Sequence, residues 1–197
     1  GEMRTSECDV VVVGVGGQGV ILISEIIGRA AMMAGLSVRG VETHGMAQRG
    51  GSVINHIRVG CSFSAMISPG SADVLLAMEP VEALRYAHYL SPQGVALVNS
   101  RPVMPITVTT GMASYPSIEE ILAPLRGICS QVKPMDATGL AEEAGSPQAT
   151  NVVMLGALSE HLPIEEATIL SALSETVPAR FLEINKKAFE LGKIEVE

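Results

Sequence analysis

The strongest hydrophobic pattern in the chain lies near its N-terminus, where the four valines Val10–Val13 precede a glycine-rich stretch. An unbroken β-branched run of this length is typical of a strand that is buried on both faces. The mostly apolar residues 20–34 follow and have the length of a helix, which Gly35 is expected to end. Strand, glycine-rich turn and helix together predict the first unit of a Rossmann-like α/β domain.

Shorter apolar runs further along the chain predict the other elements of the sheet. The predicted strands cover residues 37–41, 52–59, 63–67, 73–78, 94–98, 106–108 and 128–133. Gly60-Cys61-Ser62 indicates a hairpin between the strands 52–59 and 63–67, which makes the sheet mixed rather than purely parallel. Helices are predicted over residues 80–89, after the capping residue Ser117, and over residues 136–144.

The pattern becomes helical throughout from about residue 146. One helix follows Pro147, the next begins at Pro163, and the last runs from Arg180 to Leu191 with Gly192 as its cap. We therefore predict one domain over residues 1–197. Its fold class is α/β, a three-layer Rossmann-like domain with a largely parallel, mixed sheet and a helical C-terminal region (about 146–197).

Composition narrows the possible functions. The 197 residues carry a net charge of −8 and contain no tryptophan, which argues against binding to nucleic acid. Polar residues such as Gln18, Glu25 and Arg29 interrupt the longest apolar stretch, so we expect no membrane span, and without an export signal we expect a cytoplasmic protein. A hydrophobic fraction of 47% suggests that a partner covers some apolar surface.

The cysteines and histidines offer no obvious metal site. Cys8, Cys61 and Cys129 are far apart, so the chain is expected to hold no iron–sulfur cluster unaided, and each cysteine is expected to be a small buried residue. The four histidines lie on separate elements without a second ligand at helical spacing. His56, on the strand face it shares with Arg58, either meets an anion or lines a solvated face. We assign no catalytic residue and no metal ligand.

The glycine-rich turn allows two interpretations. Gly14, Gly16 and Gly19 occupy the positions of a GxGxxG motif, which either cradles phosphate at the helix N-terminus or lets helix and strand pack closely. We expect a Cβ at Gly16 to collide with the turn. Glu42 stands where a dinucleotide-binding domain places its ribose-binding carboxylate, but a polar loop follows it instead of a helix. This departure from the dinucleotide-binding pattern weakens the prediction that the chain binds NAD.

That polar loop, from His44 to Gly51, places an imidazole, an amide and a guanidinium among three glycines. Arg49 offers a fork of donors to a phosphate, a carboxylate or a partner's carbonyl groups. Asn99 lies at the end of a predicted strand, where open α/β sheets bind ligands. The candidate cofactor- or partner-binding residues are Gly14, Gly16, Gly17, Gln18, Gly19, His44, Gly45, Met46, Gln48, Arg49, Gly50, Gly51 and Asn99.

Several of these motifs occur in order in a known family. The turn Gly14-Val-Gly-Gly-Gln-Gly19 followed by an Arg-Gly-Gly loop resembles the gamma-type domain of the 2-oxoacid:ferredoxin oxidoreductases. Glu42-Thr-His-Gly-Met-Ala-Gln-Arg-Gly-Gly-Ser-Val53 resembles the version in the beta subunit of the indolepyruvate:ferredoxin oxidoreductases. The remaining matching segments are Asp73-Val-Leu-Leu-Ala-Met-Glu-Pro80, Val98-Asn-Ser-Arg-Pro102 and Asn151-Val-Val-Met-Leu-Gly156.

The resemblance implies a subunit of an oxidoreductase complex that is inactive alone. It implies that a larger alpha subunit holds thiamine diphosphate with magnesium and the [4Fe–4S] clusters, and that the complex converts an aryl pyruvate to an arylacetyl-CoA while ferredoxin takes the electrons. This chain would then close the active site and help to position coenzyme A through its two glycine-rich loops. The alternatives are a free-standing NAD-binding oxidoreductase and a regulatory module that binds coenzyme A or a nucleotide.

Overall fold

A computed structural model describes residues 7–44, 51–61, 63–103, 110–111 and 113–196. The strands of this part form one six-stranded sheet in the order β2-β3-β1-β4-β5-β6. Their bounds are β1 Cys8–Val15, β2 Val38–His44, β3 Ser52–Val59, β4 Ala72–Ala77, β5 Leu90–Asn99 and β6 Gln131–Met135. β1 pairs in parallel with β4, and β4–β5–β6 continue in parallel. β3 runs antiparallel to both β1 and β2, so the predicted mixed sheet is confirmed.

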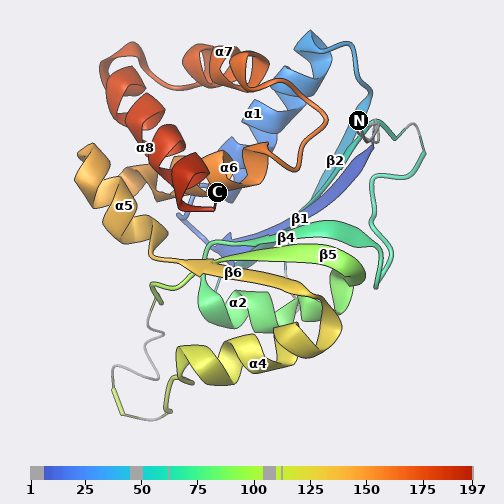
Figure 1. Cartoon of the computed structure of the whole chain (residues 1–197), viewed down its shortest axis with the longest axis vertical. Helices are drawn as coiled ribbons and strands as arrows, with labels where there is room; N and C mark the ends of the chain where they lie inside the picture. The colour runs from blue at the N-terminus through green and yellow to red at the C-terminus, as the bar shows by residue number, and fades with distance from the viewer. Residues whose placement is uncertain (1–6, 45–50, 62, 104–109, 112, 197) are drawn as a thin grey trace.

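Helices cover both faces of the sheet (Figure 1). One layer contains α1 Val20–Met33, α5 Ala137–Ala144, α6 Thr150–Ser159, α7 Glu166–Thr176 and α8 Leu182–Glu195. The other contains α2 Pro80–Arg85, the 3₁₀ turn η1 Ala87–Tyr89 and α4 Ile118–Ile128. The 3₁₀ turns η2 Pro147–Ala149 and η3 Ala179–Phe181 precede α6 and α8. This arrangement confirms the three-layer α/β prediction.

The valine run of β1 explains why both faces are covered. Val10 and Val12 belong to the core beneath α1 and α6, whereas Val11 and Val13 belong to the core beneath α2 and α4. All four side chains are fully buried. Because successive side chains of a strand point to opposite faces, a continuous apolar run requires a helical layer on each side.

The predicted hairpin between residues 52–59 and 63–67 is wrong. β3 pairs along its whole length with β1, from Cys8 opposite Val59 to Val15 opposite Ser52, and residues 63–67 form no strand. They are held instead by side chains of β3. The predicted strand over residues 106–108 lies outside the described residues.

The predicted C-terminal boundaries also differ from the structure. Gly192 is not a cap but lies inside α8, where a Cβ would overlap the carbonyl oxygen of Val153 on α6. Gly156 of α6 likewise faces the carbonyl oxygen of Phe189, so the two helices approach backbone to backbone through these glycines. α7 begins at Glu166 rather than at Pro163. No helix among the described residues is long and apolar enough to cross a membrane.

Candidate functional site

The carboxyl ends of four parallel strands lie at one edge of the sheet. β1, β4, β5 and β6 end there at Val15, Ala77, Asn99 and Met135, and the antiparallel strand β3 begins there at Ser52. The glycine-rich turn, Gly51 just before β3 and residues 100–103 after β5 therefore share this edge. In open α/β sheets this is the edge that binds ligands.

A hydrogen bond joins the two glycine-rich loops. The N–H of Gly16 donates to the carbonyl oxygen of Gly51 over 2.7 Å. The sequence placed these loops at the same end of the sheet, and this contact brings the turn after β1 against the last residue of the second loop. The candidate residues Gly45, Met46, Gln48, Arg49 and Gly50 lie outside the described residues, and His44 is described only by its backbone, opposite Val53 on β3.

The side chain of Gln18 links the glycine-rich turn by hydrogen bonds to the backbone just after β4. Its Oε1 accepts from the N–H of Val15 over 2.8 Å, and its Nε2 donates to the carbonyl oxygen of Met78 over 3.2 Å. A Cβ at Gly14 would lie 2.9 Å from that Oε1 and 3.1 Å from the Cβ of Met78. Gln18 and Gly14 thus shape the turn, and the close-packing interpretation of the motif applies to both.

The other glycines of the turn differ from the expectation. Gly16 has no positive φ, and a Cβ there would make only an ordinary contact of 3.8 Å with the carbonyl oxygen of Gly51. The predicted collision at Gly16 is therefore wrong. It falls on Gly19 instead, which has a φ of 79° and where a Cβ would overlap Nδ2 of Asn151. Gly17 has a φ of 88° but open space around it.

The start of α1 retains the features of an anion site. Its N-cap is Gly19, which has no side chain to cap the helix, and its first turn contains no acidic residue. Helix N-termini carry partial positive charge and favour anions or carbonyl oxygens. The turn is therefore compatible with a phosphate group and equally with a backbone carbonyl of another protein.

Asn99 has a structural role in the described contacts. It is buried, and its Nδ2 donates to the carbonyl oxygen of Met78 over 3.1 Å and to Oγ1 of Thr138 over 3.2 Å. Its Oδ1 accepts from the N–H groups of Arg101 and Ala137. These bonds tie the end of β5 to β4 and to α5, so the side chain is fully occupied within this chain.

A buried carboxylate that the sequence analysis missed lies at the same edge. Glu79 is 2% exposed and caps α2, because its Oε1 accepts from the N–H groups of Val81 and Glu82. Its Oε2 accepts from the N–H of Val103 over 3.0 Å and from the hydroxyl of Tyr115 over 2.7 Å. Burial and the bond to Glu79 raise the pKa of the Tyr115 hydroxyl. The sequence contains only part of the signal, since Pro80 marks the start of the helix, but Glu is not among the residues preferred at the N-cap.

Glu82 is a second buried carboxylate beside Glu79. Burial raises its pKa, while the hydroxyl of Ser52, which donates to Oε2 over 2.9 Å, and the Arg85 guanidinium act in the opposite direction. Next to this network lies a mainly apolar cavity of about 270 Å³. It is lined by Pro80, Ser100, Pro102, Tyr115, Pro116, Ile118 and Ile121.

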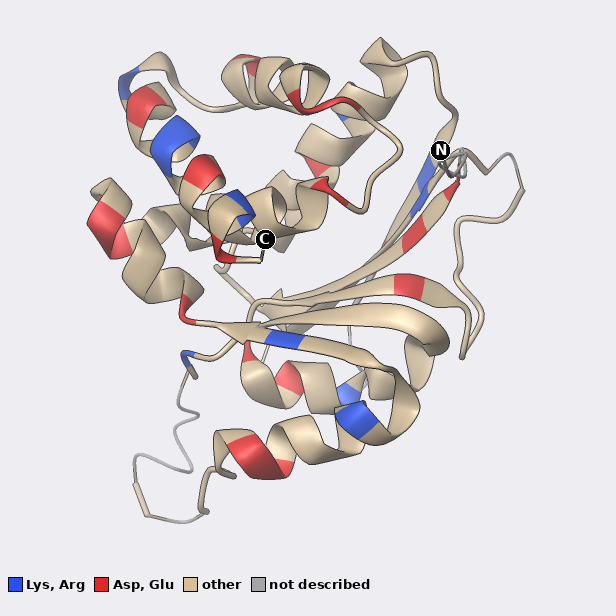
Figure 2. Ribbon diagram, in the orientation of Figure 1, with Lys and Arg blue, Asp and Glu red and all other residues tan. Residues whose placement is uncertain are grey.

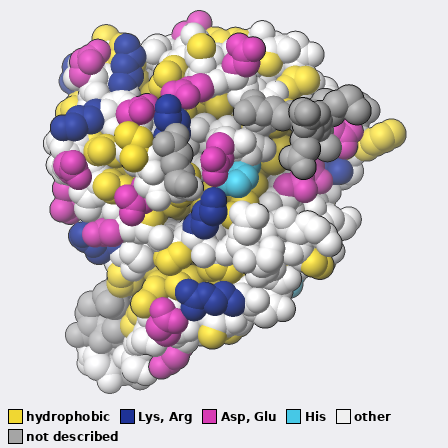
Figure 3. All heavy atoms as spheres, in the orientation of Figure 1, with side chains coloured by type: hydrophobic (Ala, Val, Ile, Leu, Met, Phe, Trp, Pro, Cys, Tyr) yellow, Lys and Arg dark blue, Asp and Glu magenta, His cyan; other side chains and the backbone are white. Residues whose placement is uncertain are grey.

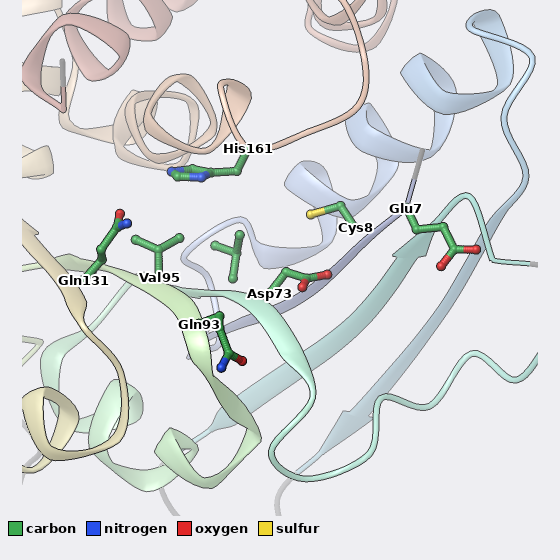
Figure 4. Close-up of a pocket in the computed structure, with 8 residues that line it drawn as sticks. Glu7, Cys8, Asp73, Gln93, Val95, Gln131 and His161 are labelled. Atoms are coloured by element: carbon green, nitrogen blue, oxygen red, sulfur yellow. The ribbon is translucent and has the colours of Figure 1, made fainter. Parts of the chain in front are cut away.

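A more polar cavity of about 220 Å³ lies away from the glycine turns (Figure 4). It is lined by Glu7, Cys8, Asp73, Val74, Gln93, Val95, Gln131 and His161. Burial, together with the carboxylates of Asp73 and Asp9, raises the pKa of the Cys8 thiol to about 12. Cys8 is therefore protonated at neutral pH and is no nucleophile.

The cysteines and His56 are core residues. Cys8, Cys61 and Cys129 are all buried, at the start of β1, after β3 and after α4. His56 is also fully buried, its Nδ1 accepts from the N–H of Ile67, and burial lowers its pKa. Both surface interpretations of His56 are thus wrong, because the loop after β3 covers its side of the strand. Among the described residues no three His, Cys, Asp or Glu side chains gather as metal ligands.

The position of Glu42 does not suit a dinucleotide site. Glu42 lies on β2 opposite Asn55 of β3, and Asn55 in turn lies opposite Val12 of β1. β3 thus separates Glu42 from β1 by two strand spacings, or about 10 Å. In a dinucleotide-binding unit the strand that carries this carboxylate is adjacent to the first.

Fold and site together define a Rossmann-like α/β domain whose glycine-rich loops meet at the carboxyl edge of a mixed sheet. The model of the pyruvate ferredoxin/flavodoxin oxidoreductase family matches residues 9–194, and the chain belongs to this family. Indolepyruvate oxidoreductase subunit IorB of Archaeoglobus fulgidus is 46% identical over 186 residues, which are 93% of this chain and 92% of the relative. The resemblance inferred from the motifs is confirmed.

Solved structures agree on the fold. The gamma subunit of a keto/oxoacid ferredoxin oxidoreductase from Geobacter sulfurreducens matches with a TM-score of 0.71 at 24% identity, over 96% of this chain and 98% of that one. A 2-oxoglutarate:ferredoxin oxidoreductase from Magnetococcus marinus, solved with 2-oxoglutarate, coenzyme A and succinyl-CoA bound, matches with a TM-score of 0.72 at 23% identity. This second match covers 98% of our chain but 31% of the larger one.

Proposed function

We propose that this chain is the subunit without redox or thiamine cofactors in an aryl-pyruvate:ferredoxin oxidoreductase complex. The observation that carries the proposal is the 46% identity with an indolepyruvate oxidoreductase subunit along nearly the whole length of both chains. Oxidative decarboxylation of a 2-oxoacid in such a complex draws on thiamine diphosphate with magnesium, [4Fe–4S] clusters and coenzyme A.

The cysteines of this chain do not fit an iron–sulfur cluster. A [4Fe–4S] cluster takes four thiolates, whereas the chain has three cysteines, all buried and on separate elements. We therefore assign the clusters to a larger partner subunit. We assign the thiamine site to the same partner and expect this chain to be inactive alone.

The contribution of this chain is to close the active site and to help position coenzyme A. The bond between Gly16 and Gly51 supports this role, because it brings the turn Gly14–Gly19 against the last residue of the second glycine-rich loop. The side-chain-free N-terminus of α1 is suited to a phosphate of coenzyme A or to a carbonyl group of the partner. Arg49, which precedes Gly50 and Gly51 in the sequence, would offer directed cationic donors for the same purpose.

Complex formation tests this proposal. When the purified chain is mixed with the larger, thiamine-binding subunit from the same organism, light scattering coupled to size exclusion should show one species that contains both chains. Two separate peaks at micromolar concentrations would contradict the proposal. Calorimetry with NADH addresses the alternative, because tight binding by the isolated chain is expected only of a free-standing dinucleotide-binding protein.

A further inference from the structure

Two carboxylates are buried near the carboxyl edge of the sheet. Glu79 and Glu82 are 2% and 4% exposed, and they are the only charged side chains that are buried in the described part of the chain. Acidic side chains otherwise reach the surface, where the magenta spheres of Figure 3 are spread over the visible face. Burying a carboxylate costs free energy unless hydrogen bonds and counter-charges offset the cost. The partners of the two carboxylates therefore indicate what each of them does.

The partners of Glu79 and Glu82 differ. Glu79 uses its oxygens for the cap of α2 and for the two further contacts described above. Glu82, three residues later, reaches the sheet, because its Oε2 accepts from the hydroxyl of Ser52 over 2.9 Å. Nε of Arg85 lies 3.3 Å from the same oxygen. α2 carries these red and blue residues beneath the sheet in Figure 2. Glu82 is thus the buried charge that links α2 to the start of β3.

Ser52 occupies the first position of β3. It is buried and lies opposite Val15, the last residue of β1, so the two form the end pair of this antiparallel ladder. An end pair has a neighbouring pair on one side only, and the ends of elements open more readily than their centres. The bond from Ser52 to Glu82 fixes this end of the ladder to α2. It therefore restrains the residue before Ser52 as well.

The residue before Ser52 is Gly51, which meets the glycine-rich turn. Its carbonyl oxygen accepts from the N–H of Gly16 over 2.7 Å. A Cβ on Gly51 would lie 3.5 Å from the nitrogen of Gly16, so the two backbones are in direct contact. One chain of contacts thus runs from Arg85 through Glu82 and Ser52 to the turn.

We propose that Ser52 and Glu82 are positioning residues, which hold Gly51 against the turn Gly14–Gly19 and thereby set the affinity of the assembled complex for coenzyme A. The inference rests on the proposed function, because it takes the ligand from it. The two side chains act through the backbone at Gly51, since a turn that is already held in its final shape loses less conformational entropy on binding. A bond that only stabilised the fold would change unfolding and leave this affinity unchanged.

Hydrogen exchange of the Gly16 amide in the isolated chain measures the positioning. The rate is taken relative to the amides of the interior strand β4, which corrects for changes in global stability. Ser52→Ala removes a hydrogen bond to a charged group and should speed the relative exchange roughly 10- to 100-fold. The matched control is Ser159→Ala, because Ser159 is also buried and its hydroxyl donates to the carbonyl oxygen of Gly156 within α6. The control should leave the relative exchange of Gly16 unchanged.

Kinetics of the assembled complex measure the consequence for coenzyme A. When Ser52→Ala replaces wild type, the KM for coenzyme A should rise roughly 3- to 10-fold. Its kcat should stay within about twofold, because the lost affinity is shared by ground state and transition state. Glu82→Gln keeps an oxygen that accepts from Ser52 but loses the charge, so its KM should fall between those of wild type and Ser52→Ala. Ser159→Ala should keep the wild-type KM.

The outcomes separate the inference from the proposed function. If the wild-type complex shows no turnover that depends on coenzyme A, the proposed function fails and the inference fails with it. If wild type turns over and Ser52→Ala leaves either the relative exchange of Gly16 or the KM for coenzyme A unchanged, only the inference fails. Equal acceleration of Gly16 and the β4 amides by Ser52→Ala also overturns the inference, because the bond then has a purely structural role.

Discussion

Three glycines of one turn make a graded test of the structure. Gly16, Gly17 and Gly19 are close in sequence, yet an added methyl group meets a different environment at each. Alanine at Gly16 requires no positive φ and makes only an ordinary contact. Because Gly-to-Ala changes at compatible positions reduce the entropy of the unfolded chain, Gly16→Ala should leave the free energy of unfolding unchanged or raise it by about 0.4–1 kcal/mol.

The other two positions should be destabilised to different extents. Gly17→Ala carries only the strain of a positive φ, about 1–2 kcal/mol, since nothing lies within 4 Å. Gly19→Ala carries the same strain and a collision with the buried Asn151, which adds about 1–3 kcal/mol for overpacking. The predicted order of stability is Gly16→Ala, then Gly17→Ala, then Gly19→Ala.

Urea denaturation with linear extrapolation measures these differences. The double variant Gly19→Ala/Asn151→Ala should be less destabilised than the sum of its single variants, because the collision is removed. The reasoning is refuted if Gly16→Ala costs as much as Gly19→Ala, or if Gly17→Ala and Gly19→Ala are equally stable.

Three further predictions follow from the helix contact, the buried histidine and the second loop. Gly192→Ala should lower the free energy of unfolding by about 1–3 kcal/mol through overpacking against Val153. The matched helical variant Gly28→Ala has open space around it and should raise the free energy of unfolding by about 0.5–1 kcal/mol. Denaturation curves check both values. Burial holds the pKa of His56 below its usual 6.5. As the pH falls below 6.5 the unfolded chain binds a proton at this position more readily than the folded chain, so the stability contributed by the neutral imidazole is lost. The difference in the free energy of unfolding between wild type and His56→Asn should change by at most about 1.4 kcal/mol per pH unit. A flat difference between pH 7.5 and 5 would count against a neutral buried imidazole. Arg49→Ala should keep the wild-type unfolding midpoint and impair either assembly or turnover, and normal assembly with normal turnover would remove Arg49 from the proposed surface.

The sequence predicted the parts of the fold that depend on local patterns. Four consecutive valines require helices on both faces, and Gly35, with a φ of 72°, closes α1 as expected. The sequence did not predict the place of β3 in the sheet. The alternating pattern of β3 suits a hairpin with the following segment as well as insertion between β1 and β2. The choice depends on pairing over distances that periodicity does not encode.

The site was predicted less completely than the fold. The glycines, Gln18 and Asn99 were recognised as candidates, but Gln18 and Asn99 act through hydrogen bonds to the backbone of Met78, which is far away in sequence. The partnership of Glu79 with Tyr115 spans 36 residues and has no sequence signature. The misplaced cap at Gly192 has a similar cause, since a helix-ending glycine and a helix-crossing glycine look alike until the facing helix is known.

Turnover of the assembled complex tests the central claim most directly. The assay is indolepyruvate- and coenzyme-A-dependent reduction of ferredoxin by this chain alone, by the larger thiamine-binding subunit alone, and by the two mixed. The account predicts no turnover by this chain alone and full turnover by the mixture. Turnover by the isolated chain, or a mixture no more active than the larger subunit alone, would contradict it.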